Sequence, residues 1–186
     1  DGEAQYCLGN SYLDGDGVKQ SYSQAIKMYQ RAIANNIAAA YNSLSLCYGY
    51  GAGLGVAKDY KKEFEWQLKA AELGLPIAMK NVALKYLNGE GVEKDESKYL
   101  EWIRRSAECG NASAQCCIGL DYYYGNVVKK DLEQAQKWFE KAISSGDLLA
   151  MSCLGIMYEN EDIKDSDGKQ KAFQLYKQAA MRGNVS

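Results

Sequence analysis

Apolar and small residues recur along this chain at two periods, the turn of a helix and a much longer interval. Each long period begins with an Ala, continues with a Leu, Val or Ile four residues later, and reaches a Tyr eight residues later. Residues spaced i, i+4 and i+8 share one face of an α-helix. The pattern predicts five copies of one amphipathic helix, helix A. Its alanines are Ala4, Ala40, Ala78, Ala114 and Ala150, and its tyrosines are Tyr12, Tyr48, Tyr86, Tyr122 and Tyr158.

A second apolar series follows each helix A and predicts a helix B. Its large members stand four residues before a pair of small residues, again on one helical face: Met28, Trp66, Trp102, Trp138 and Leu175. A Gly or Asn then stands where a left-handed C-cap would fall. These residues are Asn36, Gly74, Gly110, Gly146 and Gly183. Because a helical solenoid needs a large side chain at this point of every repeat, the three tryptophans are interpreted as packing residues.

The two helices alternate at near-constant spacing, with intervals of 36, 38, 36 and 36 residues between successive repeat alanines. Such internal repetition is typical of solenoids. We therefore expect an all-α fold, a right-handed α-α superhelix of five helix-turn-helix repeats in a single domain. The expected repeats are residues 1–36, 37–74, 75–110, 111–146 and 147–186.

Small residues in the middle of helix A indicate close helix packing. They follow the apolar residue of the series and are Gly9, Ser45, Ala83, Gly119 and Gly155. A mid-helix Gly costs about 1 kcal/mol relative to Ala. The missing side chain is therefore expected to let helix B approach.

Glycine-rich turns separate the two helices of a repeat, at Gly15–Val18, at Gly51–Val56 and at Gly89–Val92. Each is expected to be a tight turn plugged by its Val. Two later turns depart from this pattern, at Val127-Val128 and at 161–164, and are expected to be less regular. No Gly-Lys-Ser or Gly-Lys-Thr follows the glycines, so they do not indicate a phosphate-binding loop. The acidic turn residues lack a full EF-hand ligand set and are interpreted as solvated.

The composition of the chain limits which partners and which kinds of catalytic site it can have. The chain has 22 basic and 24 acidic residues, a net charge of −2, and no apolar run near the roughly 18 residues of a membrane span. These features do not indicate nucleic acid as a partner, and they do not indicate insertion into a membrane. The absence of His excludes Ser-His and Cys-His nucleophiles and histidine-bearing zinc sites. We expect no catalytic residues, no metal and no cofactor.

Six cysteines are present without a Cys-x-x-Cys pair: Cys7, Cys47, Cys109, Cys116, Cys117 and Cys153. Cys117 and Cys153 occupy equivalent repeat positions. Equivalent positions on stacked helices lie about 10 Å apart, which is beyond disulfide reach. Free thiols are therefore expected.

The repeat as a whole resembles a known family. The pattern Ala-x3-Leu-Gly-x2-Tyr-x2-Gly-x-Gly-Val, followed by a variable Asp, Ala-Ala and Gly, is similar to the Sel1-like repeat, and its best copy is 78–110. That resemblance implies a fold related to tetratricopeptide solenoids and an adaptor role that holds other proteins. A cysteine-rich branch of the family carries Cys-x7-Cys in every repeat. Here only Cys109 and Cys117 have that spacing, so the branch's disulfides and activities are not carried over.

Partner-binding residues are proposed from the geometry of helix A. With the repeat Ala as position 1, helical angles place positions 3, 7, 10 and 11 on the concave face. Position 7 is apolar in four of five repeats, with Asn10, Leu46, Leu84, Leu120 and Ile156. A groove lined by apolar residues marks a partner site, although position 7 would equally serve to pack helix A on its neighbour. The candidate residues are Asn42, Leu46, Tyr50, Leu84, Asn88, Leu120, Tyr123 and Tyr124.

Two functions compete at this point. The first is a protein-protein interaction module, an adaptor, scaffold or inhibitor of a partner protein or peptide. The alternative is a carbohydrate-binding or enzyme-accessory protein of the bacterial envelope or of host interaction, indicated only by Tyr123 and Tyr124. The last residues, 183–186, match 110–113, so we expect the chain to be part of a longer array. The compartment stays open, because any export signal would lie outside this fragment.

Overall fold

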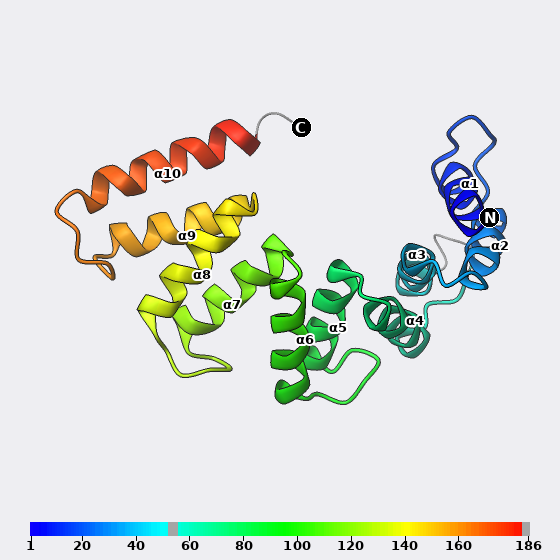
Figure 1. Ribbon diagram of the computed structural model, residues 1–186, viewed down its shortest axis with the longest axis horizontal. Coiled ribbons are helices and arrows are strands. Elements are labelled where there is room, and N and C mark those ends of the chain that lie inside the picture. Colours follow the sequence, from blue (N-terminus) through cyan, green and yellow to red (C-terminus); the bar gives the residue numbers. More distant parts are fainter. Residues whose placement is uncertain (52–55, 184–186) are drawn as a thin grey trace. The chain divides into compact units, whose positions relative to one another are not determined.

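The computed structural model describes residues 1–51 and 56–183, which form ten α-helices without a strand (Figure 1). The helices are α1 (Gly2–Asp14), α2 (Tyr22–Ile33), α3 (Ala38–Tyr50), α4 (Tyr60–Glu72), α5 (Pro76–Asn88), α6 (Glu96–Glu108), α7 (Ala112–Tyr124), α8 (Leu132–Ser144), α9 (Leu148–Glu159) and α10 (Gly168–Gly183). Odd-numbered helices are copies of helix A and even-numbered ones of helix B. The predicted all-α repeat fold is confirmed.

The chain divides into two compact units, Asp1–Trp102 and Ile103–Ser186. Within the first unit α1 packs on α2, α2 on α3, α3 on α4, and α4 on α5. Within the second, α7 packs on α8, α8 on α9, and α9 on α10. Each unit has its own apolar cluster, one around Tyr29 and Leu44 and the other around Phe139 and Leu154. The prediction of a single domain over residues 1–186 stays a prediction.

The repeat alanines lie where helices of successive repeats meet. Four of them have no exposed surface: Ala40, Ala78, Ala114 and Ala150. Ala4 is exposed, because the described chain places no helix against that side of α1. Burial of this position therefore depends on the preceding helix B.

The small mid-helix residues of helix A lie directly against large side chains of helix B. A Cβ added to Gly9 would meet the Tyr29 ring at 2.5 Å, and one added to Gly119 would meet the Phe139 ring at 2.6 Å. Gly155 has the same relation to Tyr176, also at 2.6 Å. The predicted close approach of the two helices is thus made by an aromatic ring that occupies the space of the missing side chain.

The buried wedge of helix B is one residue later than the sequence pattern predicted. Trp66 and Trp138 are only partly buried, although Met28 and Trp102 are buried as expected. The side chains with at most 1% exposure are instead Tyr29, Gln67, Ile103 and Phe139. The reason is that this position faces the small residue of helix A, whereas the tryptophans lie on its flank. Trp66, for example, packs its ring on Tyr41 with centroids 5.8 Å apart.

One backbone hydrogen bond recurs across the turn between helix A and helix B. The carbonyl of the repeat tyrosine accepts the N–H of the residue that caps helix B, at 2.8 to 3.1 Å in four repeats. The pairs are Tyr12 with Ser21, Tyr48 with Asp59, Tyr86 with Asp95, and Tyr122 with Asp131. Asp59 and Asp131 also cap their helices through side-chain oxygens. The end of one helix is thereby tied to the start of the next.

The turns differ in how well they follow the expected pattern. Residues 52–55 of the second turn lie outside the described residues. Val18, Val56 and Val92 are half-buried, so they plug the turns only partly. The fourth turn keeps both its left-handed Gly125 (φ 75°) and the Tyr122–Asp131 hydrogen bond, and it is therefore more regular than predicted.

The fifth turn departs from the others, as predicted. Glu161 adopts φ 60° at the position that Gly15, Gly89 and Gly125 fill in other repeats. The N–H of Asp167 donates to the Asp165 side chain at 2.9 Å, where the other caps bind the tyrosine carbonyl. A side chain in the left-handed region costs free energy that glycine avoids. The irregular turn is therefore locally strained.

The six cysteines are free thiols. One contact between cysteines joins positions that are not equivalent, so the comparison of equivalent positions did not predict it. Cys116 and Cys153, from positions 3 and 4 of neighbouring repeats, share a side-chain hydrogen bond. That hydrogen bond and burial raise the pKa of Cys116, and the same hydrogen bond lowers the pKa of Cys153.

We expect Gly119→Ala to destabilise the protein by about 1 to 3 kcal/mol, despite the higher helix propensity of Ala, because the fully buried Phe139 ring occupies the space of the new methyl group. Combining it with Phe139→Ile should recover most of the loss, since Ala83 and Ile103 are the natural residues at these positions in the third repeat. Urea denaturation measures both. A single variant as stable as the parent would contradict the proposed packing.

We expect Glu161→Gly to stabilise the protein by about 0.5 to 1 kcal/mol, because glycine removes the strain at positive φ, while its extra freedom in the unfolded chain offsets part of the gain. Asn36→Gly is the matched control. Asn36 has φ 56°, and Asn tolerates this region, so that replacement should change stability by less than about 0.5 kcal/mol. Equal effects in thermal denaturation would count against the strain at Glu161.

Candidate functional site

The candidate residues on helix A fall into two groups, one in each compact unit. The first unit holds Asn42, Leu46, Tyr50, Leu84 and Asn88, and the second holds Leu120, Tyr123 and Tyr124.

A groove runs over α3, α4 and α5 in the first unit. It consists of two adjoining hollows of about 270 and 240 Å³, and Leu46, Glu63 and Glu90 line both. The larger hollow also includes Tyr50, and the smaller one includes Leu84 and Asn88. Four of the five candidate residues in this unit thus line one continuous feature, which we call the α3–α5 groove.

Apolar side chains reach solvent in this groove. Leu46 is 37% exposed and Tyr50 is 72% exposed, whereas Leu84 is half-buried. The sequence alone did not decide whether the residues at position 7 pack in the core or lie on the surface. In this unit position 7 lies at the edge of the core with its outer side facing the groove. An exposed Leu and Tyr within a hollow constitute an apolar contact surface.

The fifth residue, Asn42, serves the structure of the repeat. Its side-chain oxygen accepts a hydrogen bond from the Gln67 amide at 2.7 Å, and Gln67 in turn accepts from the Ser45 hydroxyl at 2.7 Å. Ser45 and Gln67 occupy the positions of the glycine and aromatic ring in other repeats. The second repeat therefore closes its helix pair by hydrogen bonding, and Gln67 forms part of the floor of the groove.

The floor also contains an ion pair that sequence reasoning missed. The Lys85 ammonium lies 2.8 Å from Glu63 Oε1, and the side chains are only 8% and 13% exposed. Room for the carboxylate comes from Gly49, because a Cβ there would lie 2.6 Å from its carbon. Burying two charges is unfavourable unless they pair closely, so neither residue is interchangeable with a neutral one.

A comparison of equivalent positions in the five repeats could have predicted this ion pair. At the position of Gly49 the other repeats have large residues, namely Leu13, Leu87, Tyr123 and Glu159. At the position of Glu63 three of them have a buried Ala: Ala25, Ala135 and Ala172. In the second repeat, helix A thus has Gly49 where the other repeats have a large side chain. Helix B has Glu63 where three of the others have Ala. Such a reciprocal exchange indicates contact.

Lys58 lies at the rim of the groove. Its ammonium stands 4.5 Å from the centre of the Tyr60 ring, within the range of a cation–π contact. A hydrogen bond with Tyr60 raises the pKa of the exposed Lys58. This cation is therefore engaged with an aromatic ring at the edge of the groove.

In the second unit the candidate tyrosines have unequal roles. The Tyr123 hydroxyl donates to Asp162 at 3.0 Å and accepts from the Asn160 amide at 3.5 Å. Burial raises the pKa of Tyr123. Tyr124 is 62% exposed and meets the Tyr123 ring edge to face, with centroids 5.0 Å apart. Tyr124 is thus available to a partner, whereas Tyr123 supports the fifth turn.

Leu120 is half-buried and packs on the apolar cluster of its unit. At this position the packing interpretation applies more strongly than at Leu46. A charge introduced at Leu120 would disturb the core as well as any surface.

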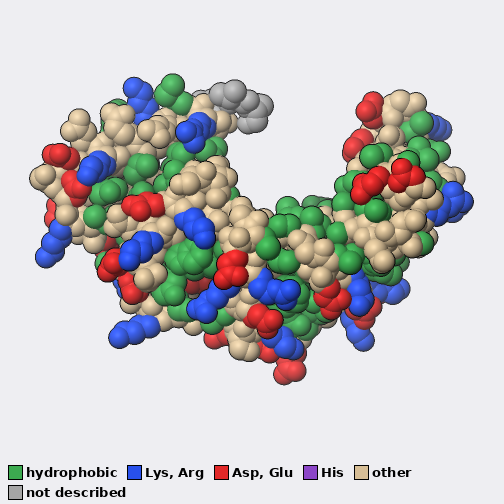
Figure 2. Space-filling view, viewed as in Figure 1, with side chains coloured by type: hydrophobic (Ala, Val, Ile, Leu, Met, Phe, Trp, Pro, Cys, Tyr) green, Lys and Arg blue, Asp and Glu red, His purple; other side chains and the backbone are tan. Residues whose placement is uncertain are grey.

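Charged side chains of both signs are interspersed over the face shown in Figure 2. None of the helices in the described ranges is long and apolar enough to cross a membrane.

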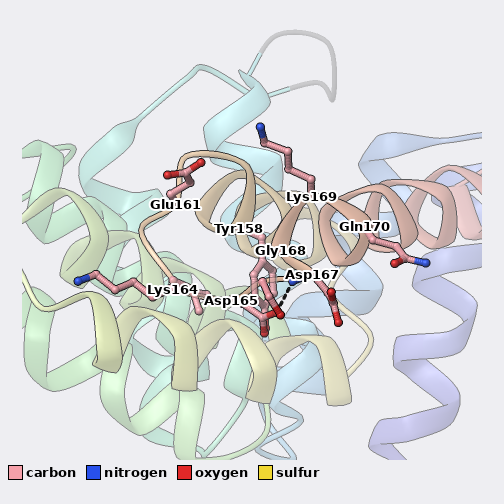
Figure 3. A pocket seen from close by; sticks show the side chains of 10 residues that line it. Tyr158, Glu161, Lys164, Asp165, Asp167, Gly168, Lys169 and Gln170 are labelled. Atoms are coloured by element: carbon pink, nitrogen blue, oxygen red, sulfur yellow. Dashed lines mark hydrogen bonds between the residues drawn. The ribbon is translucent and has the colours of Figure 1, made fainter.

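A larger hollow of about 780 Å³ lies at the fifth turn and contains none of the candidate residues (Figure 3). Tyr158 and Asp165 lie at its centre, while Lys164 and Lys169 extend away from them. Asp165 already bonds the Lys171 ammonium and the Asp167 backbone. Over residues 1–51 and 56–183 no three acidic or cysteine side chains gather in metal-binding geometry. This hollow is accounted for by the irregular turn.

We expect Lys85→Met to destabilise the protein by about 3 to 5 kcal/mol, because it leaves the buried Glu63 carboxylate without its partner. The matched control is the double variant Lys85→Met with Glu63→Gln, which removes both charges and should recover most of the loss. Met is the natural residue at this position in the fifth repeat, as Met157. Chemical denaturation distinguishes the two. Equal stability of single and double variants would show that the pair is not coupled.

Comparison with known proteins agrees with the repeat pattern. The family model described as Sel1 repeat matches residues 2–37, 38–75, 76–111, 112–147 and 149–184. No match is found among curated proteins. Among solved structures, a Sel1 repeat protein from Oxalobacter formigenes is 35% identical with a TM-score of 0.90, covering 100% of this chain and 74% of that one.

Two further structures extend the comparison. A protective antigen of uropathogenic Escherichia coli with an SLR fold is 32% identical with a TM-score of 0.87, and the alignment covers 98% of this chain and 38% of the antigen. An immunity protein from Pseudomonas aeruginosa, 22% identical with a TM-score of 0.66 over 98% of this chain and 66% of that one, shares the fold. With five matched repeats and two relatives above 30% identity, the chain belongs to the Sel1 repeat family.

Proposed function

We propose that this chain is a protein-protein interaction module that binds its partner through the α3–α5 groove and catalyses no reaction. Members of the Sel1 repeat family are generally protein-interaction modules. The observation that carries the proposal is the exposure of Leu46 and Tyr50 within a hollow of the helix A surface. Solvent contact of such apolar groups is unfavourable, and a partner that covers them gains free energy.

The chemistry of the groove favours binding over catalysis. Its most buried ionisable groups, Glu63 and Lys85, neutralise each other, and its amides Gln67 and Asn42 are hydrogen-bonded within the repeat. A nucleophile with an adjacent base would be the minimum for covalent catalysis. The groove instead combines apolar, amide and charged surface, which is typical of peptide contacts.

The alternative, carbohydrate binding at Tyr123 and Tyr124, receives less support. A sugar stacks on an exposed aromatic face, and Tyr124 provides one. Tyr123 stands edge to face against it and is tied to the fifth turn, so the two rings do not make a flat platform. A glycan array with hits that Tyr124→Ala removes would favour this alternative.

We expect Leu46→Asp to abolish capture of the partner, because a charge buried in a desolvated contact without a counter-ion costs several kcal/mol. Leu46 suits this test better than Leu84 or Leu120, since its greater exposure lets the variant fold. The experiment is affinity capture from the source cell followed by mass spectrometry, comparing the parent with the variant.

The control variant reverses two exposed lysines of α8, Lys137 and Lys141. Lys137 pairs with Glu133 one turn away, and Lys141 lies over the Trp138 ring, so both reversals act on a solvated surface. Affinity should change by less than about 1 kcal/mol. A folded Leu46→Asp protein that still captures the same partner would show that binding uses another surface.

A further inference from the structure

Two cysteines of the second unit lie in direct contact across neighbouring repeats. Cys116 of α7 belongs to the apolar cluster around Phe139, and Cys153 of α9 packs against that cluster. The two side chains share a hydrogen bond, and the helices α7 and α9 contact each other directly. The proposed binding at the α3–α5 groove involves neither thiol, because that groove lies in the first unit.

The sequence places this pair only between the fourth and fifth repeats, where position 3 of one repeat and position 4 of the next are both Cys. Position 3 holds Tyr6, Asn42, Lys80, Cys116 and Ser152, and position 4 holds Cys7, Ser43, Asn81, Cys117 and Cys153. Cys117 has the same repeat position as Cys153, but position 3 of the repeat before it is Lys80. The thiol pair is therefore a feature of these two repeats and not of the array.

The two thiols differ in their access to solvent and in their acidity. Cys116 is 1% exposed, whereas Cys153 is half-buried. The shared hydrogen bond and burial raise the pKa of Cys116. The same hydrogen bond lowers the pKa of Cys153, against the opposing effects of burial and of the Asp147 carboxylate. Because the thiolate is the nucleophile in thiol–disulfide exchange, Cys153 is the thiol that reacts first, and Cys116 lies behind it with its proton.

The contact also brings the two sulfur atoms close to bonding distance. Sulfur atoms of hydrogen-bonded thiols are in contact, and a disulfide joins sulfurs about 2.05 Å apart. Closing the bond therefore requires the short approach from hydrogen-bond contact to covalent distance. The equivalent positions Cys117 and Cys153 lack this advantage, because stacked copies of one helix lie about 10 Å apart.

We propose that Cys116 and Cys153 form a redox-active thiol pair, a modification site that reacts with a low-molecular-weight disulfide and closes to an intramolecular disulfide between α7 and α9. The bond ties two neighbouring copies of helix A and fixes the fourth repeat against the fifth. This inference goes beyond the proposed function, since it concerns a different unit of the chain and does not depend on the groove.

The reaction takes two exchange steps. The Cys153 thiolate attacks one sulfur of the small disulfide, forms a mixed disulfide with it and expels the first small thiolate. Cys116 then loses its proton, attacks the Cys153 sulfur and expels the second small thiolate, which leaves the bond between Cys116 and Cys153. The two protein thiols lose two electrons, the small disulfide gains them, and the two protons end on the two released small thiols.

The direct test exposes the folded full chain to oxidised glutathione at neutral pH. Cys7, Cys109 and Cys117 are first replaced by Ser, because these exposed or half-buried thiols would also form mixed disulfides. Cys47 is retained, since it is 2% exposed in the first unit and burial raises its pKa to about 11. The remaining reactive thiols are then Cys116 and Cys153.

In this background the protein should lose the mass of two hydrogens and retain no glutathione. A tryptic digest should join residues 106–129 to residues 142–164, which contain Cys116 and Cys153 as their only remaining cysteines. Dithiothreitol should separate the two peptides again. Unreacted thiols, glutathione that stays on the protein, or a cross-link that forms only in urea would each overturn the proposal.

Single replacements in the same background distinguish the attacking thiol from the resolving one. Cys116→Ser matches Ser152 at position 3 of the fifth repeat, and it should leave one glutathione bound to Cys153, because no second thiol is present to expel it. Cys153→Ser matches Ser43 at position 4 of the second repeat, and it should take up no glutathione, because Cys116 is buried. Glutathione uptake by the folded Cys153→Ser protein as fast as by Cys116→Ser would refute these roles.

Thermal unfolding tests whether the native packing accepts the bond. The disulfide closes the loop between residues 116 and 153, so it restricts the unfolded chain and should raise the midpoint of thermal unfolding by several degrees over that of the reduced protein. The Cys153→Ser protein is the control, and treatment with oxidised glutathione should leave its midpoint unchanged. An oxidised protein with a midpoint equal to or below that of the reduced one would overturn the proposal.

Discussion

The contact between the small residue of helix A and the wedge of helix B organises each repeat. At Gly9, Gly119 and Gly155 an aromatic ring from helix B occupies the volume of the missing side chain. Helix pairs can approach this closely only where one partner gives up bulk, and the protein interior tolerates neither a void nor an overlap there. The position of every other side chain on the two helices follows from this contact, including which face of helix A remains free. The tyrosine carbonyl that binds the cap of the next helix then sets where helix B begins.

In the second repeat polar residues make this contact. Ser45 and Gln67 replace the glycine and the ring, and their hydrogen bond closes the helix pair without an aromatic wedge. One turn later on helix A, Gly49 makes room for Glu63, which reaches Lys85 of the following repeat. Together these exchanges give the second repeat a polar floor where other repeats have apolar packing. The α3–α5 groove lies over this floor, where Glu63 of the second repeat pairs with Lys85 of the third.

The regular repeats thus form the framework of the protein, and the positions that differ from the repeat pattern give its surface features. The irregular fifth turn, with Glu161 in a left-handed conformation, lies at a large hollow in which Asp165 pairs with Lys171. The polar exchanges of the second repeat accompany smaller hollows with apolar walls formed by Leu46, Tyr50 and Leu84. Helical solenoids use the residues of helix A that do not pack between helices for recognition, and Leu46 and Tyr50 meet that description.

Much of this protein was determined by its sequence, because the repeat alanines, tyrosines and small residues report local helical geometry and recur five times. They predicted the all-α repeat fold, the turns and the close approach of helix A to helix B. Only the tertiary structure decided contacts between positions that are not equivalent, because these depend on how one helix rotates against the next. It moved the buried wedge from Trp66 and Trp138 to Gln67 and Phe139, and it brought Cys116 to Cys153. It also divided the candidate residues, placing Leu46 at a groove and Leu120 against the core. The ion pair of Glu63 with Lys85 joins two repeats across a gap left by Gly49, and three residues far apart in the chain become one feature only when the helices pack.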